Sequence, residues 1–201
     1  MGNYAGLVVR GRDGENERAG ADVVIIGDIN GDVIAVFALA APVADVSYYA
    51  PYSEGQDTAF RAGSVYIVFG DDATETSPGL PISLNIDDLD GSNGFAITPD
   101  SDLFSPFQFE VPDFGNFANG IAALGDINGD GIDDFGITNE FTSNPYGYSG
   151  YSASPYEGEG VAYVILGGQT LDATQEVDDL AGYRIDVEGS ELDVLETFDF
   201  D

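Results

Sequence analysis

Three short sequence elements recur in the same order along the chain, and this repeat restricts the folds that the chain can adopt. The acidic element GDINGD begins at Gly27 and again at Gly125, 98 residues later. Downstream of each copy, Gly63 and Gly160 open the apolar runs GSVYIVFG and GVAYVILGG. A third element occurs three times at intervals of 88 residues, as GLVV, GFAI and GYRI, starting at Gly6, Gly94 and Gly182. The chain is therefore built from repeated units.

The repeated elements have the composition of β-strands. Residues 65–69 and 161–166 are β-branched or aromatic for the most part and are bounded by glycine. Gly, Pro, Asn, Asp and Ser fill the gaps, and no segment shows a sustained helical period with caps. Each unit is predicted to contain four strands. The first leads into GDINGD (residues 23–27), the second leaves it (37–41 or 135–138), and the apolar run and the GFAI-type element form the third and fourth.

A four-stranded antiparallel unit that repeats in sequence is typical of a β-propeller blade. We therefore predict an all-β fold with two blades, residues 1–98 with a preceding outer strand and residues 99–201 with a C-terminal tail. A β-sandwich would explain the short strands but not the repeated order. Since propellers typically have four to eight blades, we expect a fragment of a larger ring, a ring completed by further copies of the chain, or a pair of packed sheets that makes no ring.

The second acidic element, DINGDGIDD, has the spacing of a calcium loop. Oxygen donors fall at loop positions one, three, five and nine, which are Asp126, Asn128, Asp130 and Asp134, and the carbonyl of Ile132 at position seven can add another. Six to eight oxygen ligands suit Ca²⁺, whereas Mg²⁺ requires stricter geometry. Without His or Cys, zinc and copper sites are not expected. The alternative is an acidic turn that binds nothing.

Two comparisons limit this prediction. An EF-hand would need a glutamate at position twelve and flanking helices, but position twelve is Ile137 and the flanks look like strands. The first copy is weaker. Asp28, Asn30 and Asp32 occupy positions one, three and five, whereas Val33 and Val36 replace the turn glycine and the last carboxylate. That copy either binds a metal ion weakly or forms only a turn.

With these motifs, the chain resembles the FG-GAP repeats of integrin α-subunit propellers. The resemblance rests on GDINGDGIDDFGI, YIVFG and DLDGSNGFAI and covers roughly residues 5–188. The GAP part of the motif is approximated by Ala40-Ala41-Pro42 in the first copy. The second copy departs from the motif, because it has Thr138-Asn139-Glu140 there. The resemblance implies the same calcium ligands as the spacing does, an ion that braces the hairpin between the first two strands, and an extracellular or cell-surface binding or adhesion module.

The charge of the chain restricts its partners. There are 37 acidic residues against 5 basic ones, and the formal net charge is −32. Nucleic acid and anionic membranes would be repelled, whereas calcium and cationic partners would be attracted. The simpler alternative is that the acidity only keeps the protein soluble. No apolar stretch is long enough to insert in a membrane, no signal peptide is visible, and no disulfide can form because cysteine is absent.

The sequence favours binding over catalysis. No histidine is present for acid–base work. Paired carboxylates such as Asp87-Asp88 and Asp178-Asp179 could serve a glycosidase, but among 37 acidic residues such pairs arise by chance, so a hydrolase is the least favoured alternative. Tyrosines gather in the connections 43–62 and 141–159, namely Tyr48, Tyr49, Tyr52, Tyr146, Tyr148, Tyr151 and Tyr156. Such composition is typical of recognition loops, so we expect a protein or glycan ligand there. The alternative is a purely structural, self-assembling repeat.

Overall fold

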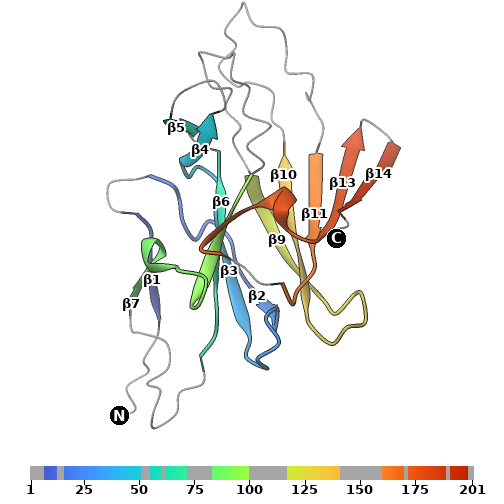
Figure 1. Ribbon diagram of the computed structural model, residues 1–201, viewed down its shortest axis with the longest axis horizontal. Helices are drawn as coiled ribbons and strands as arrows, with labels where there is room; N and C mark the ends of the chain where they lie inside the picture. Colours follow the sequence, from blue (N-terminus) through green and yellow to red (C-terminus); the bar gives the residue numbers. More distant parts are fainter. Residues whose placement is uncertain are drawn as a thin grey trace, which may run out of the picture.

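The protein folds into β-sheets in the computed structural model, which describes residues 7–12, 16–50, 55–59, 62–71, 83–99, 117–140, 160–169, 172–188 and 191–198. Two five-stranded sheets pack against each other, and two further sheets have two strands each (Figure 1). Within the described residues, helical structure is limited to single 3-10 turns, and no helix could span a membrane. The predicted all-β class with antiparallel sheets is confirmed.

The first large sheet contains the four strands predicted for the first repeat. In spatial order these are β2 (Val23–Gly27), β3 (Val36–Ala41), β6 (Ser64–Val68) and β8 (Gly94–Thr98). Neighbours pair antiparallel, so the sheet is a meander in sequence order. A fifth strand, β12 (Thr174–Glu176), comes from the second repeat and pairs parallel with β8.

The second large sheet repeats this arrangement. Its strands in order are β9 (Phe117–Gly125), β10 (Asp134–Glu140), β11 (Gly160–Ile165), β13 (Gly182–Glu188) and β14 (Glu191–Phe198). All pair antiparallel. The strand β14 lies in the segment that the sequence predicts as a C-terminal tail, so the second repeat does not end at its fourth strand.

Each fourth strand starts with glycine because a side chain at that position would collide with the neighbouring strand. A Cβ on Gly94 would collide with the carbonyl oxygen of Ile67, and one on Gly182 would collide with that of Val164. Ile67 and Val164 lie at the same position of the repeated apolar run, 97 residues apart. The third and fourth strands therefore approach closely in both sheets, and only glycine fits there.

A short parallel pairing also repeats. The strand β1 (Val8–Arg10) pairs parallel with β7 (Ser83–Asn85), in the same manner as β8 pairs with β12. Each of β7 and β12 leads into a single 3-10 turn, η1 (Ile86–Asp88) or η3 (Val177–Asp179). The GFAI and GYRI elements thus lie in β8 and β13, whereas only Val8 and Val9 of GLVV lie in β1, which belongs to neither five-stranded sheet among the described residues.

Both faces of the first sheet are covered. Along β6 the side chains alternate between two cores, with Val65 and Ile67 in one and Tyr66 and Val68 in the other. The larger core lies between the two large sheets, and the smaller lies under β1, β7 and η1. Every residue of β6 is buried, which explains why this strand reads as a continuous apolar run.

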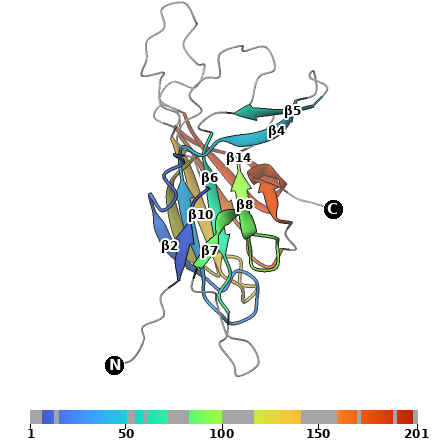
Figure 2. The ribbon, with the colours of Figure 1, turned by 90° about the vertical axis from the view of Figure 1, so that its left-hand side faces the viewer.

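The connection 43–62, predicted as a loop, contains the hairpin of β4 (Val46–Ala50) and β5 (Gly55–Ala59). Figure 2 shows this hairpin across one end of the large sheets. The loops that follow β2 and β9 lie at the opposite end (Figure 1). Of the tyrosines predicted for recognition, Tyr48 and Tyr49 lie in β4. Their side chains, Tyr52 and the connection 141–159 lie outside the described residues.

Candidate metal-binding loops

The two acidic elements form neighbouring loops at one end of the molecule. The first connects β2 to β3, and the second connects β9 to β10 (Figure 1). Both therefore link the first and second strands of a repeat, as the sequence predicts. Their proximity follows from the packing of the two sheets.

In the second loop, one carboxylate organises the turn. Asp126 Oδ1 accepts the backbone N–H of Gly129 at 2.7 Å and of Asp130 at 3.1 Å, and its Oδ2 accepts that of Gly131 at 2.9 Å. The Asp130 carboxylate accepts the Ile132 N–H and the Asn128 side-chain amide, each at 2.8 Å. The side chains at positions one, three and five are thus joined through one curled backbone.

The first loop has the same hydrogen bonds. Asp28 accepts the backbone N–H groups of Gly31, Asp32 and Val33 at 2.7–3.0 Å. Asp32 accepts from the Ile34 N–H and the Asn30 amide. The turn forms even though valine occupies position six, where Val33 has φ 71° and the matching Gly131 has φ 92°. The loss of the glycine is therefore met by strain at Val33 rather than by a different turn.

The two loops differ at position nine. Asp134 is fully buried beneath the second loop, and its two carboxylate oxygens accept the N–H groups of Ile127 and Gly167, each at 2.9 Å. The matching residue of the first loop is Val36, which is also fully buried. Asp134 can accept backbone donors there, whereas Val36 can only pack.

The loops are also bonded to each other. Asp133 Oδ2 accepts the backbone N–H of Asp28 at 2.9 Å, and the backbone N–H of Asp133 donates to the Asp28 carbonyl at 2.9 Å. A Cβ on Gly27 would overlap the Asp133 carboxylate. In the connection that follows β11, the Gly168 N–H donates to the Ile29 carbonyl of the first loop at 2.8 Å. The first loop is therefore held against the second repeat.

The oxygen donors of the second loop suit a hard cation, but the carboxylates do not converge on one point. Within the described part of the chain, no three acidic side chains lie close enough to hold a metal ion as they stand. The oxygens of Asp126, Asp130 and Asp134 are engaged by N–H donors. The residues present match the oxygen chemistry of calcium, and Asp134 could coordinate an ion while it keeps both N–H donors, because each carboxylate oxygen has two lone pairs.

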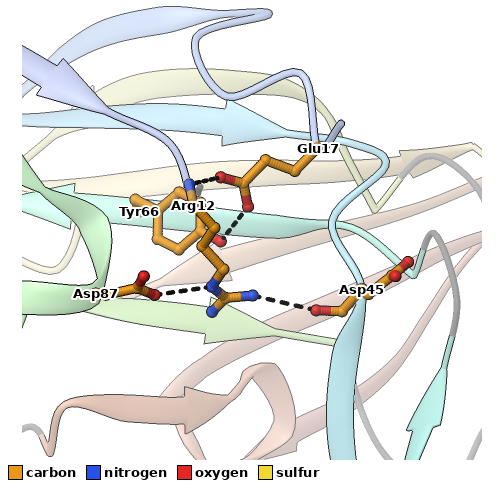
Figure 3. Close-up of polar contacts among 5 residues, drawn as sticks. All are labelled: Arg12, Glu17, Asp45, Tyr66 and Asp87. Atoms are coloured by element: carbon orange, nitrogen blue, oxygen red, sulfur yellow. Dashed lines mark hydrogen bonds and ion pairs between the residues drawn. The ribbon is translucent and has the colours of Figure 1, made fainter. Parts of the chain in front are cut away.

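A buried polar cluster was not predicted from the sequence (Figure 3). Glu17 is only 3% exposed, and its carboxylate accepts the Arg12 backbone N–H at 2.7 Å and the Tyr66 hydroxyl at 2.9 Å. The Arg12 guanidinium lies over the Tyr66 ring, pairs with Asp87 at 3.0 Å and donates to the Asp45 carbonyl. The tyrosine within the apolar run was the available signal, since a buried hydroxyl needs a partner.

This cluster perturbs two of its members. Burial raises the pKa of Tyr66, and the neighbouring Glu17 carboxylate raises it further, although Arg12 opposes the change. For Arg12, burial acts to lower the pKa, but the surrounding Tyr66, Asp87 and Glu17 outweigh it, so that the pKa is raised. Both groups therefore keep their protons, which maintains the hydrogen bonds of the cluster.

A small cavity lies between the two large sheets. Its volume is about 10 Å³, enough for about one water molecule. Gln169 is the one polar side chain in a lining that is otherwise apolar or glycine. This cavity contains no carboxylate pair of the kind that a hydrolase would need.

In comparisons with known proteins, the chain matches no protein-family model, and no curated protein is significantly similar to it.

Proposed function

We propose that the chain is a calcium-binding propeller-repeat module of the FG-GAP type, with an extracellular binding or adhesion role. The observation that carries the proposal is the second acidic loop. Its donors at positions one, three and five share one curled turn, and a fully buried carboxylate lies behind it at position nine. Two backbone N–H groups donate to this carboxylate, and a cation beside it would further offset the cost of burying its negative charge.

The residues that would hold the ion are Asp126, Asn128, Asp130 and Asp134 through their side chains, and Ile132 through its carbonyl. When bound, Ca²⁺ would supply positive charge and fix the hairpin between β9 and β10. Asp28, Asn30 and Asp32 would form a weaker site, because Val36 provides no oxygen at position nine. The negative net charge of the chain favours attraction of divalent cations.

Two features support the propeller. Each large sheet is a meander of four strands in sequence order, with a further strand at its end. The second sheet packs on the first through a shared core. In addition, β1 pairs parallel with β7 just as β8 pairs parallel with β12, so β1 repeats a feature of the fourth strand of a sheet. Blades of a propeller are arranged in this way around an axis.

The tyrosine-rich connections support a binding role. In the sequence, both follow the second strand of a repeat, β3 or β10, whereas the acidic loops precede these same strands. Calcium at one end would thus stabilise the module, while the other end presents a surface to a protein or glycan ligand.

The experiment is a calcium titration followed by calorimetry and thermal unfolding. We expect Ca²⁺ to raise the melting temperature of the wild-type protein, and Asp130→Ala to remove most of this gain. Asp172→Ala is the matched control, because Asp172 is exposed and lies outside both loops. A melting temperature that does not respond to Ca²⁺ would refute calcium binding. An equal response of wild type and Asp130→Ala would refute the assigned site.

A further inference from the structure

Asparagine is followed by glycine at four places in the described part of the chain. The dipeptides are Asn30-Gly31, Asn93-Gly94, Asn119-Gly120 and Asn128-Gly129. This dipeptide is chemically labile, because glycine has no Cβ that would keep the asparagine side chain away from the glycine nitrogen. Each of the four is therefore a candidate for deamidation, and the local structure decides which of them reacts.

Deamidation needs no reagent except water. The backbone nitrogen of the glycine forms a bond to Cγ of the asparagine, the Cγ–Nδ2 bond breaks, and Nδ2 leaves as ammonia with the proton of the glycine nitrogen. Water then opens the cyclic imide at either carbonyl and gives aspartate or isoaspartate. Hydrogen bonds that hold the side-chain amide or the glycine N–H must break before the ring can form, so the reaction proceeds from a locally opened state.

Asn93-Gly94 lies in a tightly bonded turn. The Asn93 amide donates to the Asp88 carbonyl at 2.9 Å, and its oxygen accepts the Asp90 N–H at 3.1 Å. Gly94 is buried at the start of β8, where a Cβ would collide with the Ile67 carbonyl. This site has neither a free amide nor room for the ring.

Asn119-Gly120 lies within a paired strand. Gly120 pairs with Thr138 across β9 and β10, and the Gly120 carbonyl accepts the Thr138 hydroxyl at 3.3 Å. The sheet fixes the backbone there, so the asparagine side chain does not turn freely onto the next nitrogen.

The remaining two dipeptides lie in the acidic loops and form a matched pair. Residues 28–32 and 126–130 have the same sequence, Asp-Ile-Asn-Gly-Asp. In both loops the glycine N–H donates to the aspartate at position one at 2.7 Å. Asn30 and Asn128 are both exposed. The sequence, the bond of the glycine N–H and the access of water therefore do not distinguish the two sites.

The side-chain amides do distinguish them. Asn128 Nδ2 donates to Asp130 Oδ2 at 2.8 Å, and Asn128 Oδ1 accepts the Asp130 N–H at 2.9 Å. Asn30 Nδ2 donates to Asp32 Oδ2 at 2.9 Å, but no described residue donates to Asn30 Oδ1. The Asp32 N–H donates to Asp28 Oδ1 instead, at 3.0 Å. To react, Asn128 must break two side-chain hydrogen bonds, whereas Asn30 must break one.

Backbone strain favours the same site. Val33 holds φ 71° in the first loop and is 89% exposed, so opening of this loop relieves strain and gives up little burial. Gly131 holds φ 92° at the matching position without strain, so the second loop gains nothing of this kind.

We propose that Asn30 is a site of spontaneous deamidation in the folded protein, and that Asn128 is protected by the second hydrogen bond of its side chain. The inference goes beyond the proposed function and does not rest on calcium, since it concerns the loops without an ion. One additional hydrogen bond, together with the strain at Val33, should make Asn30 react about tenfold faster than Asn128.

The reaction alters the first loop. The Asn30 amide that now donates to Asp32 would become a carboxylate beside the Asp32 carboxylate, so a hydrogen bond is replaced by repulsion. The isoaspartate product also lengthens the main chain by a methylene group. The modified loop is therefore less stable, and its aspartate form carries carboxylates at positions one, three and five.

The test is peptide mapping by mass spectrometry on the wild-type protein, incubated in chelator at mildly alkaline pH. The deamidation rate at each asparagine is divided by the rate at the same asparagine in the guanidinium-unfolded chain, which removes the intrinsic reactivity of each sequence. We expect the normalised rate at Asn30 to exceed that at Asn128 about tenfold and to exceed those at Asn93 and Asn119. Equal rates at Asn30 and Asn128, or a faster reaction at Asn93 or Asn119, would overturn the proposal.

Asp130→Ala tests the protecting bond. The variant removes the acceptor of Asn128 Nδ2 and keeps the backbone N–H that donates to Asn128 Oδ1, so Asn128 is then held at one atom, as Asn30 is. Its normalised rate should rise about tenfold, towards that of Asn30. Asn30 in the same molecule is the control and should not change, and circular dichroism verifies that the variant is folded. An unchanged rate at Asn128, or an equal rise at both sites, contradicts the assigned protection.

The chelator separates this result from the calcium proposal. Faster reaction at Asn30 than at Asn128 in chelator supports the modification site whatever the melting temperature does with Ca²⁺. A calcium-dependent rise in melting temperature together with equal rates at the two asparagines would leave calcium binding intact and refute the selective deamidation.

Discussion

Asp28 and Asp133 form two reciprocal hydrogen bonds, although 105 residues separate them in the chain. The Asp133 carboxylate accepts the Asp28 backbone N–H, and the Asp133 backbone N–H donates to the Asp28 carbonyl, both at 2.9 Å. The two acidic loops are therefore one structural unit, and the second repeat completes a turn that belongs to the first.

We expect Asp133→Ala to destabilise the fold by about 1–3 kcal/mol, because it leaves the partly buried Asp28 N–H without its acceptor. Urea unfolding measures this change. Asp133→Asn retains an acceptor oxygen of similar shape and should lose clearly less. Equal unfolding midpoints for the wild type and Asp133→Ala would show that the contact between the loops contributes nothing to stability.

Val33 and Gly131 occupy the same loop position with positive φ angles of 71° and 92°. Glycine adopts such angles without cost, whereas a β-branched residue does not. Since Val33 is 89% exposed, little burial is lost on truncation. Val33→Gly should therefore stabilise the protein, by about 1 kcal/mol after the entropy cost of glycine in the unfolded chain.

The reverse change is its counterpart. Gly131→Val should destabilise by about 1–2 kcal/mol through the backbone alone, because a Cβ at Gly131 meets no atom within 4 Å. Thermal unfolding of both variants without calcium compares the two loops directly. If Val33→Gly lowered the melting temperature, the strain at Val33 would not be the controlling effect.

Gly94→Ala tests the close approach of the third and fourth strands. Gly94 has φ 146°, and a Cβ there would collide with the Ile67 carbonyl. We expect a loss of about 2–4 kcal/mol. The control is Gly136→Ala, because the nearest atom to that Cβ lies at an ordinary 3.6 Å. Urea unfolding should place Gly136→Ala near the wild type, and a similar midpoint for Gly94→Ala would contradict the steric account.

The local sequence pattern predicted the strands that carry the repeat. The first strand was expected at residues 23–27 and is β2 with those bounds, and the apolar runs and GFAI-type elements lie in β6, β11, β8 and β13. These strands are buried on one or both faces, so their side chains show the β-branched and aromatic composition that sequence reasoning detects.

Features that depend on a distant partner were missed. The strands β7 and β12 have three residues each, and they form only because β1 and β8 offer an edge. The hairpin β4–β5 and the strand β14 lack a clear apolar alternation. Glu17 looks like an ordinary surface residue in sequence, and only its contact with Tyr66, 49 residues away, explains its burial. Propensity carries no information on such contacts.

Tyr66 gives the fold a dependence on alkaline pH. Burial, with the Glu17 carboxylate beside it, raises the pKa of Tyr66 above the ordinary tyrosine value of about 10. Above pH 10 the unfolded chain therefore loses this proton while the folded chain keeps it. The unfolded state then binds fewer protons, so stability is complete below pH 10 and falls as the pH rises beyond it, by at most about 1.4 kcal/mol per pH unit.

Tyr66→Phe removes this contribution. At pH 7 the variant should be less stable by about 1–3 kcal/mol, since it lacks the hydrogen bond from the hydroxyl to the Glu17 carboxylate. Between pH 10 and 11 the difference should shrink, because only the wild-type protein loses the stability linked to the Tyr66 proton. The other tyrosines are present in both proteins and cancel in the difference. Urea unfolding at pH 7, 10 and 11 measures it, and a constant difference would mean that Tyr66 has the same pKa folded and unfolded.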